Sequence, residues 1–265
     1  MSDVISVADV GHVRTITMNR PEKKNALSEE LAWGVITSIR EAAEEDNVWV
    51  IAITGTGDAF CSGLDLTGSG ESATPMTPQS AQLDDLGWVS RLFYTLREEC
   101  DKPIVAGING VAVGAGLSLA LAADIRLIQP SARLMAGYPR IGASPDGGMT
   151  MTLSQALGYE GAMRFLVENR TVMGEEAVAI GMAGELVEEG QMESRLAEYC
   201  AFLAERSAIT LRLTKRGLRR ATRIVDPEEQ LRYEVANIGM AFRSEDSQEA
   251  RKAFFEKREP VFKGK

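Results

Sequence analysis

The sequence predicts an α/β fold, because short apolar segments typical of buried strands alternate with segments that favour helices. Residues 48–55 (VWVIAITG) form a continuous apolar run of the kind that is buried on both faces of a parallel sheet. Residues 103–108 (PIVAGI) repeat the pattern and lead into a helix-forming run, GLSLALAA, at 116–123. With 265 residues, of which 45% are hydrophobic, the chain is long enough to enclose one large core.

Local signals predict the remaining elements of the first two thirds of the chain. Residues 6–20 alternate around a Gly-His turn and predict a β-hairpin. Ser28 precedes an amphipathic run that begins with two glutamates, which predicts a helix over 29–46 with Ser28 as its N-cap. A further helix is expected over 80–99, and further strands over 124–129 and 132–137.

The last third of the chain is expected to be helical from about residue 191. This divides the protein into a core over 1–190 and a helical region over 191–265. Two sets of apolar residues recur there at helical spacing, and each would share one helix face. The first set is Met192, Leu196, Tyr199, Cys200 and Leu203, and the second is Leu231, Val235, Ile238 and Phe242.

Composition and charge argue against several classes of protein. The net charge of −9 and the isoelectric point near 4.9 do not suit a nucleic-acid-binding surface. Residues 103–123 carry no charge and would suffice for a membrane span, but their strand-forming and helix-forming halves indicate a buried strand that leads into a buried helix. The first ten residues lack the pattern of a signal peptide, and three widely spaced cysteines suit reduced thiols. We therefore expect a cytoplasmic protein bound neither to membranes nor to nucleic acid.

Three familiar motifs are approached but not completed. Residues 114–120 (GAGLSLA) depart from the dinucleotide-binding fingerprint, because Leu119 occupies the third glycine position and no acidic residue follows about 20 residues later. Residues 142–146 (GASPD) begin like a serine nucleophile elbow, but the one histidine, His12, lies in the hairpin turn, which argues against a Ser-His-Asp triad. No cluster of Cys, His and carboxylates has the spacing of metal ligands, so no metal is expected. Chemistry should then come from backbone amides, carboxylates and hydroxyls.

Two glycine-containing turns each follow a predicted buried strand. One lies in TGTGDAFCSGLDL (54–66) and the other in GVAVGAG (110–116). Each would point unpaired N–H groups away from the sheet, and the second also lies at a helix N-terminus. Two such amides that converge on one oxygen would stabilise an oxyanion by about 3 kcal/mol per donor. The alternative is that both are only tight turns.

Several stretches resemble, in order and spacing, the crotonase superfamily, which is the enoyl-CoA hydratase/isomerase family. They are MNRPEKKNALS, TGTGDAFCSGLDL, KPIVAGINGVAVGAGLSLALAADIRL, IGASPDGGMT and AFFEKREPVFKGK, and together they span nearly the whole chain. The resemblance implies a crotonase-like spiral of ββα turns, followed by C-terminal helices that assemble a homotrimer or a dimer of trimers. It also implies an acyl-CoA thioester substrate, with coenzyme A as part of that substrate and no separate cofactor.

The resemblance also implies roles for residues at matching positions. The oxyanion hole would consist of the amides of Leu64 and Ala115. Gly63, Gly114 and Gly116 would let a thioester carbonyl approach those amides. The other candidates for substrate binding are Ser62 in the first turn, Asp65 and Leu66 around the adenine, Arg20, Lys23 and Lys24 at the phosphates, and Phe254 and Lys257 from a neighbouring subunit. An ordinary solvated charge cluster is the alternative for the basic residues.

The chain departs from the hydratases of this family at both of their catalytic glutamates. The matching positions hold Ser118 and Tyr138, whose hydroxyls are not bases near neutral pH at their usual pKa values. Asp146, which follows a proline, resembles the arrangement in enoyl-CoA isomerases of the phenylacetate type. One carboxylate suffices to remove a proton and return it elsewhere, so we expect an isomerase in which Asp146 is both acid and base.

Four alternatives remain open at this point. Asp146 could instead be the N-cap of the helix expected at 147–158. The enzyme could be a hydratase-type lyase in which Asp146, Ser118 and Tyr138 position water. Asp146 could be the nucleophile of a dehalogenase or hydrolase. The protein could also bind acyl-CoA without catalysis.

Overall fold

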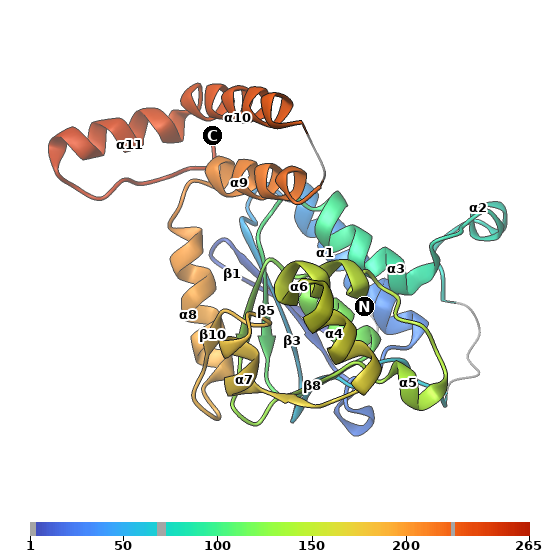
Figure 1. Cartoon of the computed structure of the whole chain (residues 1–265). Coiled ribbons are helices and arrows are strands. Elements are labelled where there is room, and N and C mark those ends of the chain that lie inside the picture. The colour runs from blue at the N-terminus through green and yellow to red at the C-terminus, as the bar shows by residue number, and fades with distance from the viewer. Residues whose placement is uncertain (1–3, 68–72, 224–225) are drawn as a thin grey trace.

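Two sheets make up the framework of the protein. The computed structural model describes residues 4–67, 73–223 and 226–265 (Figure 1). The larger sheet has the order β1-β2-β3-β5-β7-β10, in which β1 and β2 form the predicted antiparallel hairpin and the other neighbours are parallel. Its strands are β1 (Ile5–Val10), β2 (Val13–Met18), β3 (Val50–Gly55), β5 (Ile104–Ile108), β7 (Ile125–Ile128) and β10 (Glu185–Leu186).

The smaller sheet carries the repeat that makes the fold a spiral. Its order is β4-β6-β8-β9, formed by β4 (Ala59–Cys61), β6 (Val111–Val113), β8 (Arg133–Met135) and β9 (Val172–Met173). In three successive turns of the chain, a strand of the large sheet is followed by a strand of the small one: β3 by β4, β5 by β6, and β7 by β8. This arrangement confirms the crotonase-like α/β fold.

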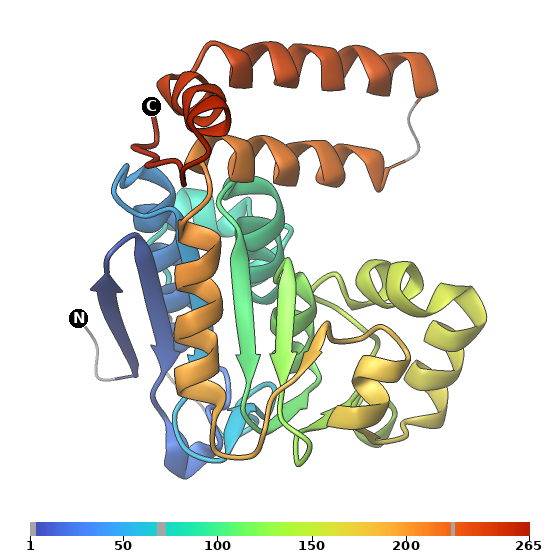
Figure 2. The same ribbon diagram turned by 90° about the vertical axis from the view of Figure 1, so that its left-hand side faces the viewer.

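Helices cover both faces of the large sheet. Helix α1 (Glu29–Glu44) begins where expected, because the Ser28 side chain accepts a hydrogen bond from the Leu31 N–H. Ile51 and Ile53 of β3 pack in the same core cluster as α1, whereas Val50 and Ala52 pack with α8 (Met192–Ala204). Since neighbouring residues of a strand point to opposite faces, α1 and α8 lie on opposite sides of the sheet (Figure 2).

The uncharged run from residue 103 to 123 forms two strands, one in each sheet, and a helix inside this framework. It contains β5, β6 and α4 (Ala115–Ala122), and every residue of α4 is buried. A helix that is apolar on every side belongs in a core. Within the described ranges, no helix is both long enough and apolar enough to span a membrane.

The single helix expected over 80–99 is wrong. The chain forms α2 (Pro78–Gln82), α3 (Gly87–Tyr94) and a π-helical turn, η2 (Thr95–Glu99). The Asp84 carboxylate interrupts the run, because it accepts hydrogen bonds from the N–H groups of Leu86 and Gly87 and pairs with Arg91. Gly87 also has a φ of +68°, which breaks the helical conformation.

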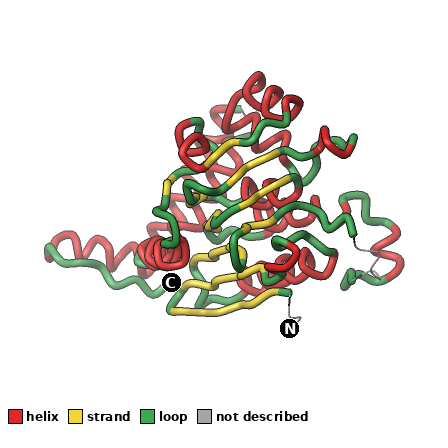
Figure 3. The backbone as a smooth tube through the Cα atoms, turned by 90° about the horizontal axis from the view of Figure 1, so that it is seen from below, coloured by secondary structure: helices red, strands yellow, loops and turns green. Residues whose placement is uncertain are grey.

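The C-terminal helices beyond α8 lie at one end of the molecule. They are α9 (Ala208–Ala221), α10 (Pro227–Phe242) and α11 (Glu245–Glu256), and α11 projects away from the strands (Figures 1 and 3). The apolar face predicted for α8 packs on the sheet through Met192, Leu196 and Cys200. The face predicted for α10 is present, but all four of its apolar residues are more than half exposed in the single chain.

Candidate active site

The two glycine-containing turns meet where β4 and β6 end. These strands are parallel neighbours, so the turns that follow them leave the sheet on the same side. Gly63 has a φ of +97°, and a Cβ placed on it would lie 2.8 Å from the Val113 carbonyl oxygen and 3.9 Å from the Ala115 nitrogen. Only glycine fits this conformation and this spacing. The turns predicted to supply two amides are therefore in direct contact.

Leu64 is held in a short parallel bridge with Leu27. The Leu27 N–H donates to the Gly63 carbonyl at 2.7 Å, and the Asp65 N–H donates to the Leu27 carbonyl at 2.9 Å. Because backbone groups alternate along an extended segment, the Leu64 N–H points away from residue 27. Ala115 is the first residue of α4, where N–H groups have no partner inside the helix. Among the described residues, neither of these two N–H groups donates a hydrogen bond.

The two positions on either side of Ala115 require glycine for different structural reasons. Gly114 is the N-cap of α4 with a φ of +53°, and the nearest atom to a Cβ there would be the Ala136 oxygen at 3.6 Å. A Cβ on Gly116 would lie 2.2 Å from the Cys61 carbonyl oxygen. Direct packing of α4 on β4 therefore accounts for Gly116, and the predicted role of this glycine in the approach of a ligand stays a prediction. Burial raises the pKa of the Cys61 thiol behind this contact to about 12, so the thiol stays neutral.

Ser118, Tyr138 and Asp146 lie together one helical turn beyond Ala115. The Tyr138 hydroxyl donates to Asp146 Oδ1 at 2.9 Å, and Ser118 Oγ donates to the Asp146 backbone oxygen at 3.1 Å. The two hydroxyls are 3.5 Å apart. Burial raises the pKa of Tyr138 to about 12, with a smaller contribution from the neighbouring Asp146 charge. Tyr138 is thus a hydrogen-bond donor at neutral pH, and Asp146 is the carboxylate of the cluster.

The N-cap role considered for Asp146 is wrong. Helix α6 (Met149–Glu168) has Gly148 as its N-cap, at a φ of +75° and with no side-chain cap. Asp146 accepts the Met149 N–H with its backbone oxygen only, which leaves the carboxylate available. A Cβ on Gly148 would lie 2.4 Å from the Phe93 ring, so this glycine lets α3 approach the turn.

The turn before Tyr138 is fixed by a residue that the sequence did not reveal. Tyr138 begins the short helix α5 (Tyr138–Ile141), after Gly137 at a φ of +80°. The Asn169 side chain accepts the Gly137 N–H at 2.8 Å from the far end of α6. No local pattern links two positions 32 residues apart, so only the fold could show this contact.

The residues expected around coenzyme A gather beside the first turn. Lys23 donates to Thr67 Oγ1 at 2.9 Å, Ser62 donates to the Lys23 carbonyl at 3.3 Å, and Lys24 pairs with Asp58 at the surface. Arg20 is more buried and donates to Asp65 at 2.8 Å and to the Ala26 carbonyl at 2.6 Å. Leu66 is 71% exposed.

Two candidates lie far from this region in the single chain. Phe254 is in α11 and is 79% exposed, and Lys257 follows the end of that helix. Figures 1 and 2 place α11 and α5 at opposite ends of the molecule. One chain therefore does not bring Phe254 and Lys257 to its own Asp146.

No histidine belongs to the cluster. His12 stacks on Trp49 with ring centroids 3.8 Å apart, and its Nδ1 lies 2.8 Å from the Asn47 carbonyl oxygen. Over the described part of the chain, no group of three or more His, Cys, Asp or Glu residues is placed to hold a metal ion.

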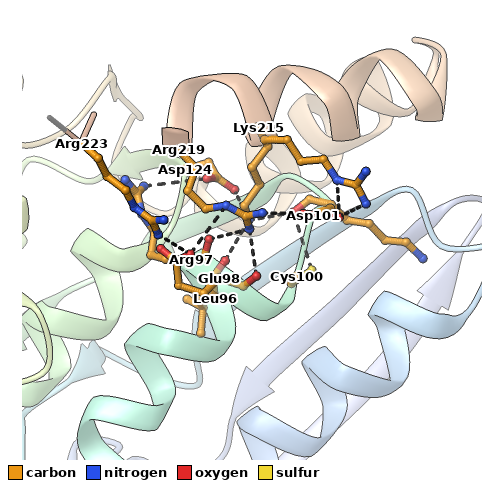
Figure 4. A network of polar contacts seen from close by, with 11 residues as sticks. Leu96, Arg97, Glu98, Cys100, Asp101, Asp124, Lys215, Arg219 and Arg223 are labelled. Carbon is orange, nitrogen blue, oxygen red and sulfur yellow. Dashed lines mark hydrogen bonds and ion pairs between the residues drawn. The ribbon is translucent and has the colours of Figure 1, made fainter. Parts of the chain in front are cut away.

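A second polar cluster joins α9 to the core (Figure 4). Lys215 is buried, pairs with Asp124 at 2.8 Å and donates to the carbonyls of Leu96 and Lys102 at 2.9 and 3.0 Å. Asp124 also accepts the Ile104 N–H. A cavity of about 390 Å³ lies beside it, lined by residues of α9, by Leu203 of α8, and by Pro103 and Ile125. This cluster lies beyond the C-terminal end of α4, whereas Ala115 is at the other end.

Comparisons with known proteins agree with this fold. The family model for enoyl-CoA hydratase/isomerase matches residues 10–265. The chain is 30% identical to the 1,2-epoxyphenylacetyl-CoA isomerase of Escherichia coli K12 over 270 residues, which cover all of both chains. It is 29% identical to the short-chain-enoyl-CoA hydratase of Clostridium acetobutylicum, over 94% of this chain and 93% of that one. The crystal structure of enoyl-CoA hydratase from Bacillus anthracis superposes with a TM-score of 0.87 at 29% identity, covering 99% of this chain and 100% of that chain. The protein belongs to the enoyl-CoA hydratase/isomerase family.

Proposed function

We propose that the protein shifts a carbon–carbon double bond in an acyl-CoA thioester, with Asp146 carrying the proton. The observation that supports this most directly is the 2.9 Å hydrogen bond from Tyr138 to Asp146 Oδ1. The cluster thus contains one carboxylate, Asp146, and the two hydroxyls of Ser118 and Tyr138. A proton shift needs a single group that can accept a proton and return it.

The reaction needs no external reactant. The Asp146 carboxylate would take a proton from the carbon next to the thioester carbonyl of a 3-enoyl thioester. The C–H electron pair then forms a carbon–carbon double bond, and the carbonyl oxygen takes the negative charge of a dienolate. When the electrons return, the protonated Asp146 delivers its proton two carbons further along the chain. The product is the conjugated 2-enoyl thioester, and the carboxylate is restored.

The dienolate oxygen would be held by the amides of Leu64 and Ala115. Support comes from the contact between their two turns and from the lack of a described partner for either N–H. The Ala115 amide also begins a helix, whose dipole favours negative charge at that end. Donors placed in advance at the developing charge lower the barrier by about 3 kcal/mol each.

Coenzyme A would bind beside the first turn, and the enzyme would act as a homotrimer or a dimer of trimers. Lys23 and Lys24 would meet the phosphates, and the backbone at Asp65 and Leu66 would meet the adenine. The apolar face of α10 and the distance of α11 from Asp146 support an arrangement in which a neighbouring subunit supplies Phe254 and Lys257.

A hydratase-type lyase is the second candidate, because the family contains such enzymes and three polar side chains meet here. Against it, Tyr138 is protonated and Ser118 is a donor, so the two-base route lacks its bases. Incubating the wild-type protein with 3-enoyl-CoA and 2-enoyl-CoA, with products identified by NMR and mass spectrometry, separates the functions. A product of unchanged mass with a conjugated double bond supports the isomerase. Gain of one water indicates the lyase, and tight binding without conversion indicates a non-catalytic acyl-CoA binder.

A further inference from the structure

Arg20 and Asp65 form a largely buried ion pair between two turns that are far apart in the sequence. Arg20 Nη2 lies 2.8 Å from Asp65 Oδ2, and their side chains are only 15% and 9% exposed. Arg20 Nη1 also donates to the Ala26 carbonyl at 2.6 Å. The guanidinium therefore joins both ends of the segment 20–26 to residue 65. Its rigid planar fork directs two separate N–H groups to these two acceptors, and each nitrogen serves one of them.

The pair lies on either side of the backbone that aims the Leu64 amide. Ala26 directly precedes Leu27, and Asp65 directly follows Leu64, its partner in the bridge. If residue 65 moved away from the segment 24–27, the bridge bonds to Gly63 and from Asp65 would lengthen together, and the Leu64 N–H would turn. The Ala115 amide has a separate support in α4, so the Arg20–Asp65 pair acts on one of the two donors.

The other groups around Asp65 complete its hydrogen bonding. Thr67 donates to Asp65 Oδ1 through its backbone N–H at 3.1 Å and through its hydroxyl at 2.6 Å, and Lys23 donates to the same hydroxyl. These donors and Arg20 hold the pKa of Asp65 well below its usual range. Asp65 is therefore charged at neutral pH, and the charge of Arg20 is already balanced within the protein. Lys23 and Lys24, which are more exposed, remain better placed for a phosphate.

We propose that Arg20 is a positioning residue, whose ion pair with Asp65 holds the Leu64 N–H in the direction that an enolate oxygen requires. This inference rests on the proposed oxyanion hole, and it differs from the role in phosphate binding that the family resemblance implies for Arg20.

The test uses a substrate that lacks the phosphates. Arg20→Gln and Asp65→Asn are compared with the wild type on an acyl-CoA and on the matching N-acetylcysteamine thioester, which has no nucleotide. We expect each variant to lower kcat on both substrates by about 10- to 100-fold, as displacement of one oxyanion donor would. The double variant should lose no more than the more affected single variant, because both changes break one contact. Arg14→Gln, which removes a similar Arg–Asp pair from the hairpin, is the matched control and should leave kcat unchanged.

A spectroscopic measurement keeps this proposal separate from the proposed reaction. The absorption of bound 4-dimethylaminocinnamoyl-CoA moves to longer wavelength when its carbonyl oxygen accepts hydrogen bonds, whether or not the protein turns over enoyl thioesters. The wild type and Arg14→Gln should show this shift, and Arg20→Gln and Asp65→Asn should lose most of it.

Two outcomes would overturn the inference. A kinetic loss confined to KM for the CoA ester, with the truncated thioester unaffected, would assign Arg20 to phosphate binding. Absence of the shift in the wild type would also overturn it. If Arg20→Gln folds poorly, two other variants carry the test. Asp65→Asn is nearly isosteric and should lose most of the shift, and Arg20→Lys, which retains the charge, should keep part of it.

Discussion

The Tyr138 hydroxyl donates a 2.9 Å hydrogen bond to Asp146 Oδ1, from the start of α5 to the turn before α6. The hydroxyl is a buried donor, and the Asp146 carboxylate does not cap α6, the helix that follows it. The pair thus combines a fixed hydrogen bond with an available proton acceptor, next to the end of α4 where two amides have no described partner.

Tyr138 should stay protonated well into the alkaline range. Its pKa is raised to about 12, so the neutral hydroxyl is retained in the folded state after an unfolded tyrosine, with an ordinary value of 10.0, has lost its proton. The stability that this provides is fully present below pH 10 and is lost as the pH rises toward 12. We expect kcat to remain level up to pH 10, whereas Tyr138→Phe lowers kcat about tenfold at every pH by removing the donor. When tyrosinate absorbance is followed as the pH rises, Tyr138→Phe should lack one of the tyrosines that lose their proton last in the wild type. A tyrosine lost from the ordinary range instead would contradict the assignment.

The Gly63 turn should tolerate no side chain, for two reasons that can be separated. Gly142 also has a positive φ, +66°, but a Cβ there would meet nothing within 4 Å. Gly142→Ala therefore reports the cost of the conformation alone, about 1–2 kcal/mol. Gly63→Ala adds the clash with the Val113 oxygen, and we expect at least about 2 kcal/mol more together with loss of turnover in protein that remains folded. Urea unfolding and kcat measure the two effects. Equal costs for the two variants would mean that the turns are not in contact.

Lys215 should anchor α9 to the core. It is buried, pairs with Asp124 and donates to two backbone carbonyls, so Lys215→Met removes all three polar contacts and should lower the free energy of unfolding by about 3 kcal/mol. Arg232→Met removes an exposed pair with Glu228 and should change it by less than about 0.5 kcal/mol. Chemical denaturation gives both values, and similar small losses would show that α9 is held by apolar packing alone.

Asp65 should make the stability of the protein sensitive to acid. Hydrogen bonds from Thr67 and Arg20 lower its pKa from an ordinary value of 3.8, so its contribution is fully present above that value and is lost as the pH falls below it. The difference in Tm between wild type and Asp65→Asn should accordingly be largest at neutral pH and shrink below pH 3.8. Substitution of the exposed Asp85 by Asn provides the control. A Tm difference that does not change with pH would mean that Asp65 stabilises the protein by something other than its charge, and would contradict this prediction.

Local sequence signals were enough for most of the fold. The hairpin, the Ser28 cap and the strand-to-helix run before Asp124 depend on residues close together in the chain, and the structure confirms them. The helix over 80–99 failed because apolar spacing does not reveal that the Asp84 carboxylate competes for backbone N–H groups at the start of α3. The Asp146 cap failed for a related reason: two consecutive glycines with positive φ let the helix begin without a side-chain cap.

The candidate site could be predicted from sequence only in part. The meeting of Ser118, Tyr138 and Asp146 came from family positions, since helical or strand spacing does not connect them. Arg20 and Asp65 were both candidates, but as separate ligands of coenzyme A. Their pairing joins residues 45 positions apart, and the contact of Lys215 with Leu96 joins residues 119 apart. Contacts of that kind depend on the folded topology, which one sequence does not display.

The most direct test of the account follows solvent deuterium in wild-type protein and in Asp146→Asn. In D₂O with a 3-enoyl-CoA, the wild type should form the conjugated 2-enoyl thioester. Deuterium should enter at the carbons that lose and gain protons in those turnovers in which the protonated Asp146 exchanges with solvent before it returns the proton. Asp146→Asn should bind the thioester with a similar Kd but slow both exchange and conversion by about 10²- to 10⁴-fold, because the amide cannot accept the proton. Exchange and conversion that persist in Asp146→Asn would contradict the assignment of Asp146 as the proton carrier.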